Sequence, residues 1–215
     1  MPDSPVTTEN LRERLGAGLA AMDADRDWPV DALAAYVELL SRWNRAYNLS
    51  AVRDPLQMVS VHVLDSLAVE PVLRGQRLLD VGAGAGLPGI PLALVDPERE
   101  VTLLDSNGKK VRFLRQAALE LGLRNVEPVH ARVQDWQPAA GFDTVICRAY
   151  TSLSAFWHQT RHLLAADGVA MAMKGRYPEE ELGELAADDV SWQCRRLDVP
   201  GLEAERHVII LEPVG

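Results

Sequence analysis

The sequence contains no apolar run long enough to cross a membrane, since no window approaches the roughly 18 uninterrupted apolar residues that a span needs. The segment from Met1 to Asn10 is polar and acidic and lacks the basic-then-apolar order of a secretory signal peptide. Cysteine is scarce: Cys147 and Cys194 lie far apart and show neither a CxxC nor a Cys/His spacing. No disulfide framework and no metal site is therefore indicated, and we expect a protein of the reducing cytoplasm.

Positive charge is also in short supply, because 22 Lys and Arg residues face 31 Asp and Glu residues and the net charge is −9. This balance argues against bulk, non-specific binding to nucleic acid, which needs a basic face that displaces counterions. It does not exclude a local basic site. The length of 215 residues, with 47% hydrophobic residues, accommodates one full α/β domain and a modest extension.

The first third of the chain predicts helices. Apolar residues recur at three- and four-residue spacing between residues 33 and 47, after a start signal at Pro29. We expect a second helix to begin at its cap Asp54 and to continue through Val61, and a third, short helix to cover residues 63–73.

The rest of the chain alternates strands with helices, and the clearest helices are expected over residues 109–121 and 153–164. The expected strands are five short β-prone runs and a closing pair joined by a Pro200-Gly201 turn: 77–81, 101–104, 126–129, 142–147, 168–173, 192–199 and 207–211. This order predicts a Rossmann-like α/β domain over residues 76–215, with a mostly parallel seven-stranded sheet that ends in an antiparallel pair. Residues 1–75 are then a helical extension packed on this core.

A glycine-rich turn provides the strongest motif, the run LLDVGAGAGLPG at residues 78–89. An apolar strand leads into glycines, which permit positive φ and let a ligand approach the backbone closely. Gly82, Gly84 and Gly86 fit the GxGxG loop of class I S-adenosylmethionine-dependent methyltransferases. Gly84, Gly86 and Gly89 also fit the dinucleotide fingerprint GxGxxG, which alone is a weak signal.

The register of this loop favours a methyltransferase. In the dinucleotide fold the first glycine follows the strand almost directly, whereas Gly84 lies three residues beyond Val81. An acidic residue before the first glycine, here Asp80, also matches the methyltransferase pattern. A dinucleotide site and a purely structural turn stay open as alternatives. Asp105 ends the second expected strand, where a carboxylate accepts hydrogen bonds from ribose hydroxyls in either class; its alternative role is a cap for the next helix.

The tip of the fourth expected strand, VICRAY at residues 145–150, lies beside the transferable methyl group in such a fold. It lacks the Asp/Asn-Pro-Pro-Tyr-like motif typical of enzymes that methylate exocyclic amino groups. Cys147 lacks the proline that accompanies the nucleophile of cytosine-C5 enzymes, and strand alternation turns it into the fold. The remaining acceptor type brings its own lone pair. Guanine N7 does so and loses no proton when alkylated, so orientation matters more than a general base.

Several segments resemble the glucose-inhibited division protein B family, the bacterial 16S ribosomal RNA guanine-N7 methyltransferases, and the resemblance covers nearly the whole chain. The segments that carry it are 43–49 (WNRAYNL), 62–66 (HVLDS), 80–91, 104–106 (LDS), 110–114 (KVRFL) and 206–207 (RH). The resemblance implies a monomeric enzyme that methylates a guanine in the 530 loop of 16S ribosomal RNA, free or within the small ribosomal subunit. Together with the glycine pattern, it implies S-adenosylmethionine contacts from Gly82, Gly84, Gly86, Leu87, Val133, Gln134 and Arg148, with Asp105 on the ribose.

Local basic groups must offset the acidic total if RNA is the substrate. The expected RNA contacts are cations at or beside the ends of expected strands: Lys109, Lys110, Arg112, Arg115, Lys174 and Arg176. Solvated helix faces are the ordinary alternative for such charges.

Polar residues interrupt the apolar N-terminal helices at Asn44, Asn48, His62 and Asp65. We expect them to form a hydrogen-bonded network that holds these helices on the sheet, with direct RNA contact as the alternative.

Arg148 is the only charged residue at the tip of the fourth strand and is the candidate catalytic residue. We expect its guanidinium to bind an anion, either the carboxylate of the cofactor or an RNA phosphate; an internal ion pair is the alternative. For the chain as a whole, two other functions stay open. One is a methyltransferase that acts on another RNA or a small molecule, and the other is a non-catalytic nucleotide-binding protein.

Overall fold

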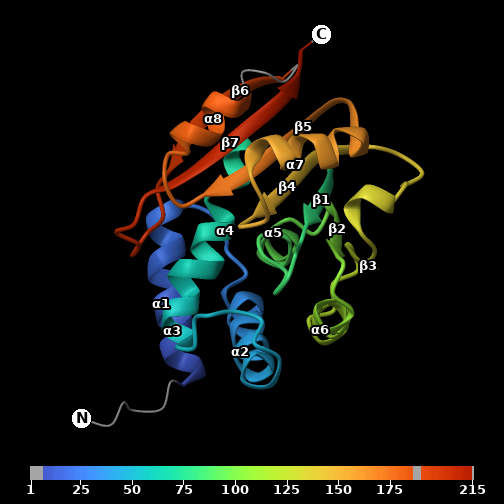
Figure 1. Cartoon of the computed structure of the whole chain (residues 1–215). Helices are drawn as coiled ribbons and strands as arrows, with labels where there is room; N and C mark the ends of the chain where they lie inside the picture. Colours follow the sequence, from blue (N-terminus) through green and yellow to red (C-terminus); the bar gives the residue numbers. More distant parts are fainter. Residues whose placement is uncertain (1–6, 186–189, 215) are drawn as a thin grey trace.

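The computed structural model describes residues 7–185 and 190–214, which form a seven-stranded sheet with helices on both faces (Figure 1). The strands are β1 (Arg77–Val81), β2 (Glu100–Asp105), β3 (Val126–His130), β4 (Phe142–Arg148), β5 (Leu164–Lys174), β6 (Val190–Leu197) and β7 (Arg206–Pro213). Their spatial order is β3-β2-β1-β4-β5-β7-β6. The first five strands run parallel, and β7 pairs antiparallel with both β5 and β6, so the predicted sheet is confirmed.

The two faces of the sheet bury different sets of side chains, because successive residues of a strand point to opposite sides. Leu78 belongs to one buried cluster and Leu79 to the other. The first face is covered by the N-terminal helices with α5 (Gly89–Val95) and α6 (Gly108–Glu120), and the second by α7 (Leu153–Thr160) and α8 (Glu179–Leu185) (Figure 1). Short 3₁₀ turns cover residues 70–72, 133–135 and 161–163.

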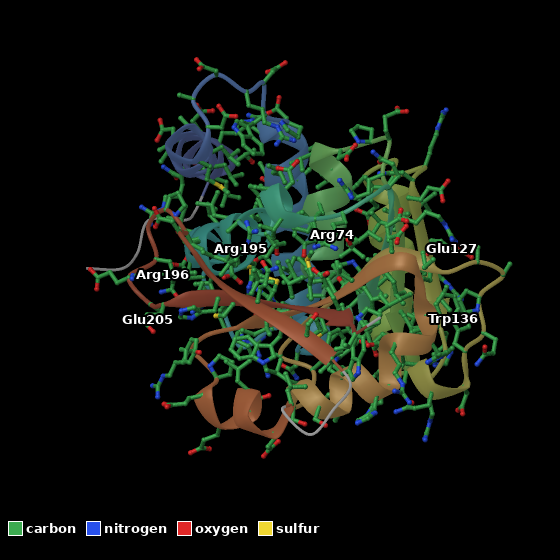
Figure 2. The ribbon with its side chains drawn as sticks, turned by 90° about the horizontal axis from the view of Figure 1, so that it is seen from above. Arg74, Glu127, Trp136, Arg195, Arg196 and Glu205 are labelled. Atoms are coloured by element: carbon green, nitrogen blue, oxygen red, sulfur yellow. The ribbon has the colours of Figure 1, made fainter. Side chains whose placement is uncertain are left out.

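The edges of the sheet lie on opposite sides of the molecule. Figure 2 looks down on it and places Glu127 of β3 and nearby Trp136 at one side, with Arg195 and Arg196 of β6 at the other. Strand β1 therefore sits well inside the sheet, and the loop that follows it is flanked by other strands.

Two helices were not predicted from the sequence, α1 (Thr8–Met22) and α8. The signals for α1 were present: Thr7 and Asn10 form a capping box, and a leucine stripe at four-residue spacing is buried in the core cluster that includes the first face of the sheet. Residues 1–6, 186–189 and 215, which belong to the two expected parts of the chain, lie outside the described residues.

The expected break between the second and third N-terminal helices was wrong. One continuous helical stretch runs through α3 (Pro55–Met58), the π-helix η1 (Val59–Leu64) and α4 (Asp65–Leu67). The cap at Asp54 is confirmed, since its side chain accepts a hydrogen bond from the backbone N–H of Leu56 at 3.0 Å. In the π-helix the N–H of Asp65 bonds to the carbonyl of Ser60, five residues back. This wider turn shifts the apolar stripe along the sequence, which gives the appearance of a break.

The N-terminal helices share one buried core with the first face of the sheet. Leucines of α1, α2 (Val30–Tyr47) and α4 belong to the same cluster as Leu78 of β1. Tyr36 of α2 is fully buried, and its hydroxyl donates to the carbonyl of Ala85 in the glycine-rich loop at 2.9 Å. None of the helices in the described ranges is long and apolar enough to span a membrane.

We expect Tyr36→Phe to lower the free energy of unfolding by about 1–2 kcal/mol, because the variant leaves the Ala85 carbonyl without this partner in a buried setting. Urea denaturation measures the change. Tyr47→Phe makes the same chemical change on a ring that is 38% exposed and should alter stability by less than about 0.5 kcal/mol. Equal losses in the two variants would show that the Tyr36 hydroxyl does not tie α2 to the loop.

Candidate active site

The carboxyl ends of the parallel strands meet at one edge of the sheet, and the loops that follow them line three adjoining cavities. The first cavity has a volume of about 470 Å³ and is lined by Val81, Gly82, Leu104, Asp105, Ser106, Lys110, Ala131, Arg132, Val133, Gln134, Ala149 and Tyr150. The second, of about 250 Å³, is lined by Leu49, Ser50, Gly82, Ala83, Gly84, Ala85, Leu87, Lys110, Arg148 and Ala149. The third, of about 360 Å³, is lined by Val61, His62, Asp65, Arg148, Ala149, Met173, Lys174, Gly175 and Arg206.

These cavities adjoin one another through shared lining residues. The first and second share Gly82, Lys110 and Ala149, and the second and third share Arg148 and Ala149. In open α/β sheets, ligands bind at this edge, where the strand order reverses beside the first strand. Most of the predicted site residues therefore lie together: Gly82, Gly84, Leu87, Asp105, Lys110, Val133, Gln134, Arg148 and Lys174.

The glycine loop has the left-handed conformation that its composition predicts, with φ of +70° at Gly82, +59° at Gly84 and +82° at Gly86. A Cβ at residue 82 would lie 2.7 Å from the ring of Tyr150, so this ring packs directly on the loop backbone. Gly86 differs from the other two because it is not among the residues that line the cavities. A Cβ there would lie 2.3 Å from Ile90, so Gly86 makes the turn into α5 possible, and the geometry gives no support to its predicted cofactor contact.

Asp105 fixes the loop against the start of α6. Its Oδ2 accepts a hydrogen bond from the N–H of Gly84 at 2.9 Å, and its Oδ1 accepts one from Asn107 at 2.8 Å. The cap of α6 is Asn107, whose side chain accepts from the N–H of Lys109, so the alternative role of Asp105 as the helix cap is not what the structure contains. Asp105 as a whole is 5% exposed and lines the first cavity.

Asp80 lies beneath the loop and is completely buried. Its Oδ2 accepts a hydrogen bond from the N–H of Gly89 at 2.9 Å, while its Oδ1 has no partner among the described residues. Burial raises the pKa of this carboxyl group to about 7, and the hydrogen bond from Gly89 and the charge of Arg148 oppose that shift. Asp80 thus holds the first turn of α5 against the end of β1.

The tip of β4 has a left-handed backbone conformation that no sequence motif predicted. Ala149 has a φ of +51°, a conformation that costs a non-glycine residue of the order of 1 kcal/mol, and it lines all three cavities. The residue before it, Arg148, faces the second and third cavities, and the residue after it, Tyr150, faces the first. Because Ala149 is left-handed, the side chains of Arg148 and Tyr150 on either side of it face different cavities.

Arg148 is held by an internal ion pair, the alternative that its sequence position had left open. Its Nη1 lies 3.1 Å from Oδ2 of Asp65 and 3.0 Å from the carbonyl of Val61, inside the π-helix. Asp65 is 2% exposed, and its Oδ1 accepts a second charge-assisted hydrogen bond, at 2.7 Å, from Nε of Arg206. An acidic side chain of the protein itself thus pairs with Arg148, while the expected contact with a cofactor carboxylate or an RNA phosphate stays a prediction.

His62 extends this network to the end of α2. Its Nε2 lies 2.7 Å from Oγ of Ser50, and its Nδ1 lies 3.4 Å from Nη2 of Arg148. The N–H of Ser50 in turn donates to Oδ1 of Asn44 at 2.8 Å. Burial, followed by the charge of Arg148, lowers the pKa of His62 to about 4, so the ring is neutral at neutral pH.

The predicted network of polar N-terminal residues is therefore confirmed. Asn48 takes part at its rim, because its Oδ1 accepts from Nη2 of Arg53 at 2.5 Å while the residue ends α2 at a φ of +50°. Sequence reasoning missed Ser50, which links Asn44 to His62 and also lines the second cavity.

Some of the candidate RNA-binding cations are exposed, and others line a cavity or form ion pairs. Lys109, Arg112 and Arg115 are exposed on α6, and Arg176 is exposed after β5. Lys110 instead lines two cavities, with its Nζ 3.8 Å from Oδ2 of Asp105. Lys174 lies 2.8 Å from a carboxylate oxygen of Glu181, so much of its charge is already engaged. The exposed cations Arg195 and Arg196 of the edge strand β6 had not been singled out.

Comparison with known proteins agrees with this geometry. The family model described as GidB, rRNA small subunit methyltransferase G, matches residues 30–209. A ribosomal RNA small subunit methyltransferase G from Methylococcus capsulatus is 53% identical over 86% of this chain and 90% of its own length. Another, from Chromohalobacter salexigens, is 54% identical over 95% and 98%. Among solved structures, the glycopeptide N-methyltransferase MtfA, in complex with S-adenosyl-L-methionine, aligns with a TM-score of 0.60 at 12% identity, over 70% of this chain and 87% of its own. The fold is that of the class I S-adenosylmethionine-dependent methyltransferases.

We expect Asp65→Asn to lower the free energy of unfolding by about 3 kcal/mol, because it removes the negative charge that two largely buried guanidinium groups share. The matched control is Asp31→Asn, which weakens an ion pair with Arg12 on the surface, where Asp31 is 81% exposed. That change should cost less than about 1 kcal/mol. Chemical denaturation of the two variants compares the losses. A small loss for Asp65→Asn, similar to that of the control, would mean that the shared carboxylate is not an anchor.

Proposed function

We propose a specific reaction for this chain, which belongs to the GidB family, rRNA small subunit methyltransferase G: transfer of a methyl group from S-adenosylmethionine to N7 of a guanine in the 530 loop of 16S ribosomal RNA. Membership of the family accounts for methylation of small-subunit ribosomal RNA. The choice of guanine N7 is supported by the chemistry of the acceptor cavity, and the choice of the 530 loop by the sequence resemblance.

The first two cavities fit the two halves of S-adenosylmethionine, which supplies a methyl group on a positively charged sulfur. Asp105 presents its carboxylate to the first cavity, where it suits the ribose hydroxyls of the adenosine half. Val133 and Gln134 border the same cavity and are our candidates for contact with the adenine. The backbone of the glycine loop lines the second cavity, where only small residues leave room for the amino-acid half.

The third cavity is the place for the acceptor base. It joins the second cavity at Arg148 and Ala149, and Val61, Met173 and Gly175 supply apolar and backbone surface for a flat ring. A base that enters this cavity from an unpaired loop meets the transferable methyl group at the tip of β4. Ribosomal RNA loops present such bases, since sequence-specific RNA recognition largely targets unstacked nucleotides.

The observation that favours N7 is the absence of an unengaged base among the described residues that line the third cavity. Both oxygens of Asp65 accept from guanidinium groups. His62 is neutral, but its Nδ1 faces Arg148 and its Nε2 faces the hydroxyl of Ser50. Lys174 is paired with Glu181. A reaction that requires removal of a proton from the acceptor is poorly served by this arrangement.

Methylation at N7 needs no such group. The lone pair of N7 forms the new C–N bond while the S–C bond breaks, the sulfur keeps the electron pair, and the positive charge passes to the purine. Attack by Cys147 is the main chemical alternative. Its side chain is 3% exposed in the second buried cluster, and burial raises the pKa of the thiol, so a thiolate is strongly disfavoured.

The product test uses small ribosomal subunits that lack the modification, with labelled S-adenosylmethionine. We expect label in 16S ribosomal RNA and, after borohydride reduction and aniline treatment, strand cleavage at one guanine of the 530 loop. Cys147→Ser should keep most of the specific activity of the folded protein. A folded but inactive Cys147→Ser variant with a C5-methylated pyrimidine as product would refute the N7 assignment. Transfer of the labelled methyl group only to other RNA or to small molecules would refute 16S ribosomal RNA as the substrate.

The exposed cations of α6 are our candidates for contact with the RNA outside the acceptor cavity. Lys109, Arg112 and Arg115 lie on the helix that begins beside the first two cavities, and none of their side chains forms an ion pair within the described part of the chain. Nearby, the exposed ring of Tyr47 is stacked on Trp43 at 4.9 Å, which leaves an aromatic surface for an RNA base. Lys174, although paired with Glu181, lines the acceptor cavity, and the exposed Arg176 follows it two residues later; we include both in the proposed RNA surface.

We expect the double variant Arg112→Gln/Arg115→Gln to bind 16S ribosomal RNA more weakly and with a shallower salt dependence. Each phosphate contact contributes about 0.7–0.9 to the slope of log K against log salt, so the slope should fall by about 1–2. Its affinity for S-adenosylhomocysteine should not change. The control Arg12→Gln/Arg14→Gln removes two exposed charges from α1 and should leave the slope intact. An unchanged slope in the α6 variant would show that Arg112 and Arg115 do not contact RNA phosphates.

A further inference from the structure

The amino-acid half of S-adenosylmethionine carries a carboxylate, which needs a partner in the second cavity. Two charged side chains line that cavity in the part of the chain that the structure describes, Lys110 and Arg148. Burial of a carboxylate without a cation or a hydrogen-bond donor is costly, so one of these side chains is the natural partner.

Arg148 is poorly available for this role. Its Nη1 already bonds to Asp65 and to the carbonyl of Val61, and its Nη2 faces His62. Asp65 is 3% exposed in its side chain, so movement of Arg148 toward a ligand would weaken a nearly buried ion pair.

Lys110 is more exposed than Arg148 and less tightly paired. Its side chain is 40% exposed, and its Nζ lies 3.8 Å from Oδ2 of Asp105, at the outer limit of an ion pair. The same Nζ would lie 3.8 Å from a Cβ at residue 84, so the ammonium group stands over the glycine loop. Lys110 also lines both the first and the second cavity. A loosely held ammonium on a flexible stem can reach either of them.

Asp105 does not require Lys110 as its main partner. Its two oxygens already accept hydrogen bonds from Gly84 and Asn107, at 2.9 and 2.8 Å, and the ribose hydroxyls add further donors in the proposed complex. A donor from the ligand thus replaces the weak contact with Lys110, while the ammonium becomes free to turn toward the second cavity.

We propose that Lys110 binds the carboxylate of the amino-acid half of S-adenosylmethionine, and that it leaves Asp105 to do so when the cofactor enters. The inference rests on the proposed cofactor site. It assigns to α6 a role in cofactor binding that is separate from the RNA contacts of its exposed face.

Calorimetry with three ligands tests this role without any turnover. The ligands are S-adenosylhomocysteine, its decarboxylated analogue that keeps the amine, and 5′-methylthioadenosine, which lacks the whole amino-acid part. We expect Lys110→Gln to bind S-adenosylhomocysteine about tenfold more weakly than the unmodified chain, as for the loss of one charge-assisted hydrogen bond. The other two ligands should bind both proteins equally. Lys110→Arg should retain most of the affinity for S-adenosylhomocysteine.

The matched control is Arg124→Gln, which removes one exposed positive charge from the loop after α6 and should leave all three affinities unchanged. Equal binding of S-adenosylhomocysteine to Lys110→Gln and to the unmodified chain would overturn the inference while the cofactor site stands. An equal loss for 5′-methylthioadenosine would also overturn it, because Lys110 would then act on the adenosine side through Asp105. If the unmodified chain binds none of the ligands, the cofactor assignment itself fails.

Discussion

The site depends on one nearly buried carboxylate. Asp65 belongs to the N-terminal helices, Arg148 ends β4, and Arg206 begins β7, so the two charge-assisted hydrogen bonds of Asp65 join three separate parts of the chain. A charge in such a place is tolerable only when its partners are fixed, and the partners are fixed because both are anchored at strand ends. The tip of β4, with the left-handed Ala149, is thereby held between the second and third cavities.

This anchor also addresses an electrostatic problem of the proposed reaction at guanine N7. A free guanidinium beside a sulfonium, and beside a purine that gains positive charge, would oppose methyl transfer. Asp65 faces Arg148 directly, and the neutral ring of His62 adds no further charge. In that proposal, the polar network provides orientation at the third cavity while it limits the positive potential there. The same logic favours our proposal that the more exposed Lys110, which also lines the second cavity, is the cation for the ligand carboxylate.

Local patterns in the sequence were sufficient to predict the strands, the glycine loop and Asp105, because each depends on neighbouring residues and on a fixed strand-turn-helix order. The long-range pairings were not predictable in the same way. Asp65 is separated from Arg148 by 83 residues and from Arg206 by 141, and nothing in the composition of those segments matches one partner to another. The positive φ of Ala149 has no residue signature, since glycine or asparagine would be the usual signal. Lys110 and Lys109 look equivalent in sequence, and only the orientation of α6 separates a cavity residue from a surface residue.

The π-helix at Val59–Leu64 has a consequence for how this segment tolerates changes in length. In an ordinary α-helix, one added or deleted residue rotates everything beyond it by about 100° about the axis. Here the wider turn already contains an additional residue, which sets the angle between the buried side chains on its two sides, Met58 and Asp65. Loss of a single residue within the turn would let the helix close to α-geometry and carry His62 and the Val61 carbonyl out of phase with Arg148. The network therefore constrains the length of this stretch as well as the identity of its polar residues.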